Sequence, residues 1–337
     1  MADSTVLLFP GIDAYSTGVL RQARFQFDVV NDTLAEIDHR AADFAIPSVT
    51  DVLFNGNPPT FGELRALGGE LAELVVFSVS LATARALLDQ GLEPYGLLGH
   101  SFGEMAALTA AGAFTPADGV VLVHARFAAF ETIKAEGAMA VIGAGEAETR
   151  DLLAGPTERQ LQIACVNTPT LCVVSGPVAA IDLGAKAAHD AGLSWSRIDL
   201  PYAAHHQSAR KASECFLDLT AGLRQRPLRH PVFSPVRNLW YDDGDDLLRA
   251  FAECMWRPVR FSDAVRTLHE GGAQIFVEAG ARRSLTRCVA EILAGAPGVN
   301  CVAPLRDPRA ETAALTQAAN ADAYRSAGAM PSAPKAN

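Results

Sequence analysis

The 337-residue chain is 49% hydrophobic and 20% charged, which is long and apolar enough for a large core and for more than one domain. Its formal net charge of -10 argues against a nucleic-acid partner, because phosphate backbones favour a basic surface. The six cysteines form no CxxC pair and show no metal-ligand spacing. With no leader-like start, we expect reduced thiols in a cytoplasmic protein.

The first third of the chain has an α/β pattern. Residues 4–11 predict a strand and a Pro-Gly turn, and residues 64–88 predict one helix without internal proline. The apolar run at 74–88 is shorter than the roughly 20 residues that span a bilayer, so we expect a buried helix and no membrane partner. Residues 95–99, YGLLG, then predict a buried parallel strand, and a helix of small residues follows at 101–114.

The middle of the chain alternates differently. Strands are predicted at 138–144, 161–167, 170–176 and 193–200, and helices at 146–155 and 179–192. This β-α-β-β-α-β order is the ferredoxin-like pattern. We therefore expect an inserted small subdomain at 136–199, a large subdomain built from 1–135 and 200–310, and a C-terminal helix with a flexible tail at 311–337. Another apolar strand is predicted at 274–280.

The segment Gly99-His100-Ser101-Phe102-Gly103 fits G-x-S-x-G between a predicted strand and a predicted helix, which is the setting of a nucleophile elbow. Such a turn exposes the serine hydroxyl, and the first N–H groups of the helix can stabilise an oxyanion. The alternative is a glycine-rich turn with a helix-capping serine. A nucleophilic serine needs a base, and periodicity does not choose among the eight histidines, although His205 and His206 follow the last strand of the insertion.

At this point the chain resembles the acyltransferases that load acyl carrier proteins, namely malonyl-CoA:acyl carrier protein transacylases and polyketide synthase acyltransferase domains. The resemblance follows an ordered series along nearly the whole chain: FPG, GHSFGE, Arg126, GAMAVIG, VNTPTLCVVSG, YAAHH, RPVRF and FVEAGA. It implies an α/β-hydrolase-like large subdomain with a ferredoxin-like insertion.

The resemblance also implies the catalytic roles. Ser101 would be the nucleophile that becomes acylated, and His205 the general base, with His206 as the alternative base. The N–H groups of Ile12 and Phe102 would bind the oxyanion. A main-chain carbonyl around Cys254 would orient the histidine in place of a triad aspartate.

Two further residues concern the acyl group. Arg126 would bind the free carboxylate of a malonyl-type unit, since a guanidinium binds carboxylate bidentately, and His100 would contribute to substrate binding. The usual alternative for a lone arginine is a surface residue. The chain departs from the family where FPGQGSQ is replaced by Phe9-Pro10-Gly11-Ile12-Asp13, and this changes the pocket wall.

The function implied is acyl transfer from a coenzyme A or carrier-protein thioester to the phosphopantetheine thiol of an acyl carrier protein, with no cofactor and no metal. Three alternatives stay open: transfer of a non-carboxylated acyl or aminoacyl group, hydrolysis of stalled acyl groups, and a catalytically silent carrier-binding module. The acidic run 242–246 favours a helix-capping turn over a calcium loop, and a metal site of His124 with His205 and His206 is disfavoured. A basic rim for the acidic carrier would comprise Arg257, Arg260, Arg282, Arg283 and Arg287.

Overall fold

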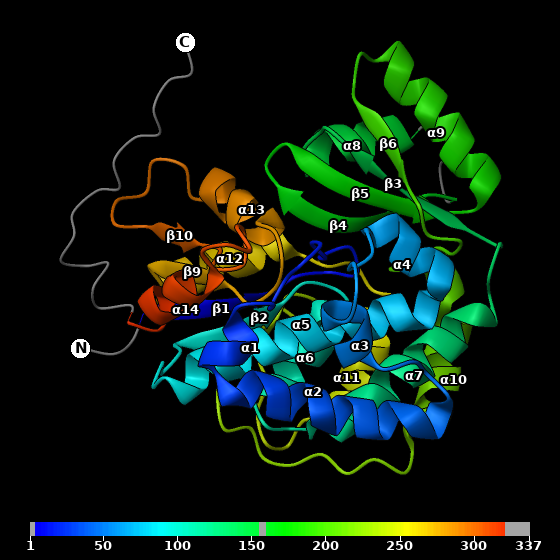
Figure 1. Cartoon of the computed structure of the whole chain (residues 1–337). Helices are drawn as coiled ribbons and strands as arrows, with labels where there is room; N and C mark the ends of the chain where they lie inside the picture. The colour runs from blue at the N-terminus through cyan, green and yellow to red at the C-terminus, as the bar shows by residue number, and fades with distance from the viewer. Residues whose placement is uncertain (1–3, 155–159, 321–337) are drawn as a thin grey trace.

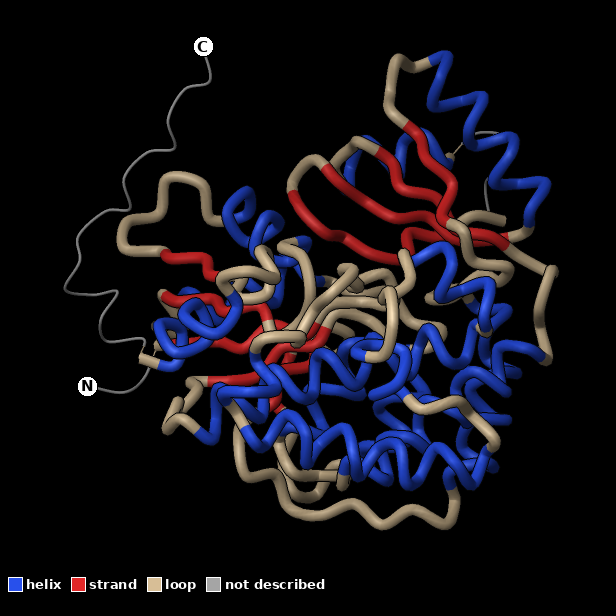
Figure 2. The backbone as a smooth tube through the Cα atoms, viewed as in Figure 1, coloured by secondary structure: helices blue, strands red, loops and turns tan. Residues whose placement is uncertain are grey.

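The computed structural model describes residues 4–154 and 160–320. The strands of this part of the chain form two separate sheets, which Figure 2 shows as two groups joined through loops. The larger sheet, with its helices, holds the first and last thirds of the chain, and the smaller sheet holds the middle (Figure 1). Of the C-terminal helix and flexible tail expected at 311–337, residues 321–337 lie outside the described residues, as does the predicted end of a helix at 155.

The large sheet has the strand order β10-β9-β1-β2-β7-β8, and all its neighbours are parallel except β7 and β8. Both central strands are wholly buried, which explains their continuous apolar sequences. The strands are β1 (Thr5–Phe9), β2 (Gly96–Gly99), β7 (Val232–Ser234), β8 (Leu239–Trp240), β9 (Ile275–Glu278) and β10 (Asn300–Val302).

Helices pack around this sheet and on one another. Their bounds are α1 (Ala23–Gln26), α2 (Asp28–Ala41), α3 (Val49–Phe54), α4 (Phe61–Leu67), α5 (Gly69–Asp89), α6 (Gly103–Ala110), α7 (Pro116–Glu131), α10 (Arg210–Thr220), α11 (Leu247–Cys254), α12 (Phe261–Glu270), α13 (Ser284–Ile292) and α14 (Glu311–Ala319), with 3₁₀ turns at Ala42–Phe44 and Gln207–Ala209. Helix α6 follows β2 directly and contacts β1, β2 and β7, so it packs on the middle of the sheet.

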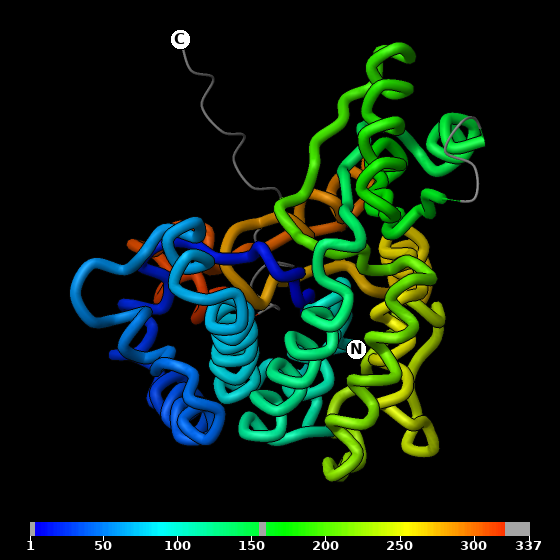
Figure 3. The backbone as a smooth tube through the Cα atoms, turned by 90° about the vertical axis from the view of Figure 1, so that its right-hand side faces the viewer, coloured from blue at the N-terminus to red at the C-terminus, as the bar shows by residue number. Residues whose placement is uncertain are grey.

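The small sheet is antiparallel with the order β4-β5-β3-β6, and α8 and α9 pack against it. Its elements are β3 (Ala138–Ile142), α8 (Glu146–Leu153), β4 (Gln162–Thr168), β5 (Leu171–Gly176), α9 (Val178–Asp190) and β6 (Trp195–Ile198). The predicted ferredoxin-like order of elements is confirmed. The green segment stands at one end of the molecule in Figure 1, and the turned view in Figure 3 agrees.

A short β-bridge joins the two parts. Val259 pairs with Cys165 of β4: its N–H donates to Ala164 O at 2.9 Å, and its carbonyl accepts from Val166 N at 2.9 Å. The segment before α12 is thereby hydrogen-bonded to the edge of the small sheet. Residues just before this bridge lie beside the candidate catalytic site.

One predicted helix is wrong in its extent. The structure divides 64–88 between α4 and α5, and Gly68 ends the first helix and precedes the second with an extended backbone. Two consecutive glycines, Gly68 and Gly69, have low helix propensity, and a Cβ at Gly69 would lie 3.0 Å from the Phe127 ring. The prediction relied on the absence of internal proline between 64 and 88 and did not count this glycine pair as a break.

Helix α5 is long and apolar enough to cross a membrane by length and composition, yet 89% of its most apolar window is buried inside the protein. It packs against α2, α4, α6 and α7. The helix is therefore a central part of the hydrophobic core, as its sequence predicted.

Candidate active site

Ser101 lies in a tight turn between β2 and α6. Its backbone has φ of 55°, in the left-handed region that residues with a side chain rarely adopt. A Cβ on Gly99 would lie 2.3 Å from Glu104 Cα, and one on Gly103 would lie 2.1 Å from Phe9 O. Only glycine allows strand and helix to approach this closely, and the turn has the geometry expected of a nucleophile elbow.

His205 reaches this serine from the segment after the small sheet. The Ser101 Oγ and His205 Nε2 atoms are 2.6 Å apart, and His205 Nδ1 is 3.0 Å from the carbonyl oxygen of Arg257. A carbonyl only accepts hydrogen bonds, so Nδ1 carries the ring proton and Nε2 is the acceptor for the serine hydroxyl. This arrangement prepares the serine oxygen to lose its proton to the imidazole.

The orienting carbonyl is expected around Cys254, in the segment before PVRF. The carbonyl within hydrogen-bonding distance of Nδ1 is that of Arg257, the residue directly before PVRF, and a backbone hydrogen bond with Cys254 acts on the same ring. Cys254 also contacts the nucleophile, because its thiol lies 3.8 Å from the Ser101 carbonyl oxygen. The sequence motif thus located the segment that orients the histidine.

Burial lowers the pKa of His205 to about 4, and the nearby charges of His100 and Arg126 act in the same direction. The carbonyl of Arg257 opposes this shift by accepting a hydrogen bond from the ring. The imidazole is therefore neutral at neutral pH and able to accept a proton.

The two predicted oxyanion donors have no competing partner in the described residues. The main-chain N–H groups of Ile12 and Phe102 donate no hydrogen bond within this part of the protein. Ile12 and Phe102 line the same cavity as Ser101. Their N–H groups are thus available to a substrate, and their oxyanion role stays a prediction.

The cavity at Ser101 has a volume of about 480 Å³ and lies between the two parts of the chain. Gly11, Ile12, His100, Ser101 and His205 line it from the large part, and strands β3, β4 and β5 line it from the small sheet. His100 Nε2 lies 2.8 Å from Asn167 Oδ1, so the amide of β4 holds the ring in place. Sequence reasoning included His100 and missed Asn167.

Arg126 also lines this cavity from α7, but it is not a surface residue. It is 4% exposed, and its NH1 group donates to Glu73 Oε2 of α5 at 2.6 Å. Its NH2 group lies 3.3 Å from the Tyr202 hydroxyl. Burial acts to lower the pKa of Arg126, and Glu73 and Tyr202 more than offset it, so the net pKa is raised and the guanidinium stays charged.

His206, the alternative base, points elsewhere. Its Nδ1 atom lies 2.8 Å from Ser208 Oγ at the start of a 3₁₀ turn. His124 pairs with Glu70 at 2.6 Å, so the three histidines do not meet. Within 4–154 and 160–320, no group of His, Cys, Asp and Glu side chains is arranged to hold a metal ion. Asp246 caps α11, as expected for a solvated turn.

The arginines of the expected basic rim have mixed surroundings. Arg287 lines the cavity of Ser101, while Arg282 donates to the Tyr15 carbonyl at 2.8 Å. Arg260 is paired with Glu146 and Asp263, and Arg257 with Glu253. Much of this positive charge is therefore compensated within the protein.

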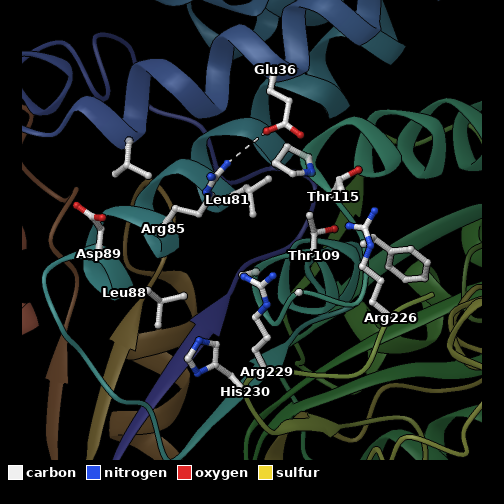
Figure 4. Close-up of a pocket in the computed structure, with 15 residues that line it drawn as sticks. Glu36, Leu81, Arg85, Leu88, Asp89, Thr109, Thr115, Arg226, Arg229 and His230 are labelled. Carbon is white, nitrogen blue, oxygen red and sulfur yellow. Dashed lines mark ion pairs between the residues drawn. The ribbon is translucent and has the colours of Figure 1, made fainter. Parts of the chain in front are cut away.

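A second cavity of about 490 Å³ lies elsewhere, beside the last turns of α5 and α6 (Figure 4). Arg85, Arg226, Arg229 and His230 line it, and Arg85 is 3.7 Å from Glu36. It shares no described lining residue with the Ser101 cavity. It thus brings no side chain to the serine.

A serine in a strand-to-helix elbow, hydrogen-bonded to a neutral histidine above an α/β sheet, defines an α/β protein of the nucleophilic-serine class. The small sheet forms a second wall of the site. The site is therefore of the kind in which a serine of an α/β part faces a separate antiparallel sheet.

Comparisons with known proteins agree. A model of the family described as "Acyl transferase domain" matches residues 25–330. Erythronolide synthase EryA2 of Saccharopolyspora erythraea is 30% identical over 295 residues, covering 88% of this chain and only 8% of that protein. The acyltransferase domain of SpnD, solved with 2-(pent-4-yn-1-yl)malonyl, is 26% identical with a TM-score of 0.82, covering 95% of this chain and 78% of that one.

A malonyl-transacylase solved with a type II polyketide synthase acyl-carrier protein is 21% identical with a TM-score of 0.82, covering 95% of this chain and all of that one, and it shares the fold. The family match covers most of the chain. The protein therefore belongs to the acyl transferase domain family, and its α/β-hydrolase-like large part with a ferredoxin-like small part is that family's architecture.

Proposed function

We propose that this protein transfers an acyl group from a thioester donor, through an ester on Ser101, to the phosphopantetheine thiol of an acyl carrier protein. The observation that carries this proposal is the 2.6 Å contact between Ser101 Oγ and the unprotonated Nε2 of His205, inside a cavity large enough for an acyl chain.

In the first half-reaction, Ser101 Oγ gives its proton to His205 Nε2 and bonds to the thioester carbonyl carbon. The N–H groups of Ile12 and Phe102 stabilise the resulting oxyanion. The carbon–sulfur bond then breaks, and the leaving thiolate takes the proton from His205. The second half-reaction is the reverse, with the carrier thiol as nucleophile, so no cofactor is required.

Three observations bear on the acyl group, and they do not all point in the same direction. Arg126 at the cavity wall and the malonyl derivative bound to SpnD support a malonyl-type unit. The buried pairing of Arg126 with Glu73 favours the alternative, an acyl group without a free carboxylate.

Polyketide biosynthesis in the cytoplasm is the proposed setting. It is supported by the polyketide synthase relatives, by the acyl-carrier protein bound to a transacylase of this fold, and by six cysteines that are all free thiols. The proposed donor is an acyl-coenzyme A or an acylated carrier protein. Arg287 at the cavity and the neighbouring rim would meet the acidic carrier.

Intact-protein mass spectrometry after exposure to a panel of acyl thioesters tests the proposal. We expect one acyl group to be added to the wild-type protein and none to Ser101→Ala. Ser284→Ala is the matched control, because this serine lines the same cavity. Acylation that persists in Ser101→Ala and disappears in Ser284→Ala would remove Ser101 from its role.

Omitting the carrier protein distinguishes transfer from hydrolysis. A transferase retains its acyl-serine until a holo acyl carrier protein is added, which then gains the acyl mass. Rapid formation of free acid without a carrier would instead support the hydrolase alternative.

A further inference from the structure

The wall of the Ser101 cavity includes an arginine, Arg126, whose charge is already compensated by a carboxylate. The guanidinium of Arg126 on α7 and the carboxylate of Glu73 on α5 are 2.6 Å apart, and the side chains are 5% and 6% exposed. A surface ion pair would be screened by water and would open easily for a competitor. The Arg126–Glu73 pair is shielded from solvent, so water screens it little and a substrate carboxylate does not easily displace Glu73.

Further contacts surround the guanidinium on other sides. Its NH2 group lies 3.3 Å from the Tyr202 hydroxyl. Its central carbon lies 4.6 Å from the centre of the Phe130 ring and 5.2 Å from that of Phe102. Aromatic faces and a phenol therefore hold the cation in one place.

A malonyl carboxylate at this point would be a second negative charge beside Glu73. Like charges in a low-dielectric site repel strongly, and at this point the substrate carboxylate would exchange its water for a guanidinium whose charge is already paired with Glu73. An acyl chain without charge avoids both costs. The electrostatics thus disfavour the carboxylated unit that a free arginine would attract.

The rest of the cavity has the same preference. Its walls carry aliphatic side chains from both parts of the chain: Ile12, Met139, Val141, Leu171, Val173, Ile198 and Leu200. These apolar side chains suit the hydrocarbon part of an acyl chain, while Asp13, Arg287 and Glu291 bring charge to the same lining. Where the chain departs from FPGQGSQ, Ile12 adds an apolar side chain to the wall and Asp13 adds a carboxylate.

We propose that Glu73 is a specificity-determining residue: it cancels the charge of Arg126 and so selects acyl thioesters whose chain carries no free carboxylate, such as alkanoyl and 3-oxoalkanoyl groups. The inference rests on the proposed acylation of Ser101 and specifies its substrate class. Arg126 then serves to hold Glu73 and Tyr202, which line an adjoining cavity, rather than to bind a substrate anion.

A competition between malonyl-coenzyme A and acetoacetyl-coenzyme A tests this. Their acyl groups have the same number of heavy atoms and differ in one place, where a methyl group replaces a carboxylate oxygen. An equimolar mixture is given to the protein, and the two acyl-enzymes, whose adduct masses are nearly equal, are distinguished at early times by the mass of the proteolytic peptide that carries Ser101. The variant is Glu73→Gln, which keeps a hydrogen-bond acceptor for Arg126 and removes the charge.

Glu70→Gln is the matched control. Glu70 is on the same helix, one turn earlier, and removing its charge leaves the Arg126 contact intact, because Glu70 pairs with His124. We expect the wild-type protein and Glu70→Gln to favour acetoacetyl by about tenfold or more. Glu73→Gln should shift the ratio toward malonyl by at least tenfold.

A malonyl adduct that dominates in the wild type would overturn the inference, as would an unchanged ratio in Glu73→Gln. Failure of the proposed function has a different result, because the protein would then form neither adduct, even from longer alkanoyl thioesters. In that case the inferred preference for uncharged acyl groups is rejected as well.

Discussion

At the scale of single residues, His205 is set by its surroundings as a neutral base. Burial brings its pKa to about 4, and the Arg257 carbonyl fixes which nitrogen carries the proton. Ser101 and His205 could be predicted from the sequence, Ser101 from the motif around it and His205 from the resemblance of the YAAHH segment. The partners could not: Glu73 lies 53 positions from Arg126, Asn167 lies 67 from His100, and Arg257 lies 52 from His205. Only tertiary folding brings such distant residues together.

The first residue-scale prediction concerns pH. The pKa of His205 is lowered in the folded protein, so the imidazole stays an active base as pH falls through its ordinary value of 6.5, and protonates only near pH 4. The rate constant of Ser101 acylation should therefore be flat from pH 8 to about 5 and fall by half near pH 4. Rapid-quench acylation, with circular dichroism to check folding at each pH, measures this. A midpoint near 6.5 would contradict it.

The same shift affects stability with a defined sign. Below pH 6.5 the unfolded chain takes up a proton on His205 that the folded protein refuses until about pH 4. The contribution of His205 to the free energy of unfolding is thus complete above 6.5 and is lost as pH falls toward 4.

The second residue-scale prediction separates main chain from side chain at Arg257. Because its carbonyl orients His205, Arg257→Ala keeps the contact, and we expect kcat/KM to change by less than about threefold, since its exposed ion pair with Glu253 contributes little. His205→Ala should reduce acylation by about 10²–10⁴-fold. A loss in Arg257→Ala as large as that in His205→Ala would show that the guanidinium itself is needed.

At the scale of elements, the sequence predicted the buried strands β1, β2 and β9 and the six elements of the small sheet, because their patterns are strong and local. It did not predict the short strands β7, β8 and β10, which are three residues or fewer and depend on pairing with neighbours. The division between α4 and α5 was missed because Gly68 and Gly69 lie inside an otherwise helical pattern.

The elbow supplies the prediction at this scale. In Gly103→Ala the new methyl group would meet Phe9 O at 2.1 Å, and β1 or α6 must shift. We expect a loss of about 1–3 kcal/mol in the free energy of unfolding and a strong loss of acylation. Urea denaturation and acyl-enzyme mass measure the two effects.

Gly62→Ala is the control within a helix. A Cβ there meets nothing within 4 Å, and alanine favours α4, so stability should hold or rise by about 0.5–1 kcal/mol. Equal effects of the two substitutions would contradict the close approach of α6 to β1.

At the scale of the whole molecule, the order of elements predicted a small sheet inserted into a larger α/β part. The hydrogen bonds and ion pairs that join the two parts could not be predicted from the sequence. Besides the Val259 bridge, Arg260 before α12 pairs with Glu146 at the start of α8, at 2.9 Å. Hydrogen bonds from Arg260 bring the pKa of Glu146 down to about 2. This carboxylate therefore stabilises the folded state fully above about pH 4.5, and the effect is lost as pH falls toward 2.

Arg260→Ala should lower the thermal midpoint at pH 7 by roughly 2–3 °C, because it releases the ion pairs to Glu146 and Asp263. Arg249→Ala, which breaks an exposed pair with Asp246, should leave the midpoint unchanged within about 1 °C. Differential scanning calorimetry at pH 7 measures both, and equal midpoints would contradict a joint between the two parts.

The bridge at Val259 has a mechanical consequence. Arg257, whose carbonyl oxygen accepts the hydrogen bond from the His205 ring, lies only two positions before Val259, which forms the β-bridge to β4. Tilting the small sheet away from the large one would therefore displace the Arg257 carbonyl that orients His205. A partner that moves the small sheet would therefore also move the support of His205, the proposed catalytic base.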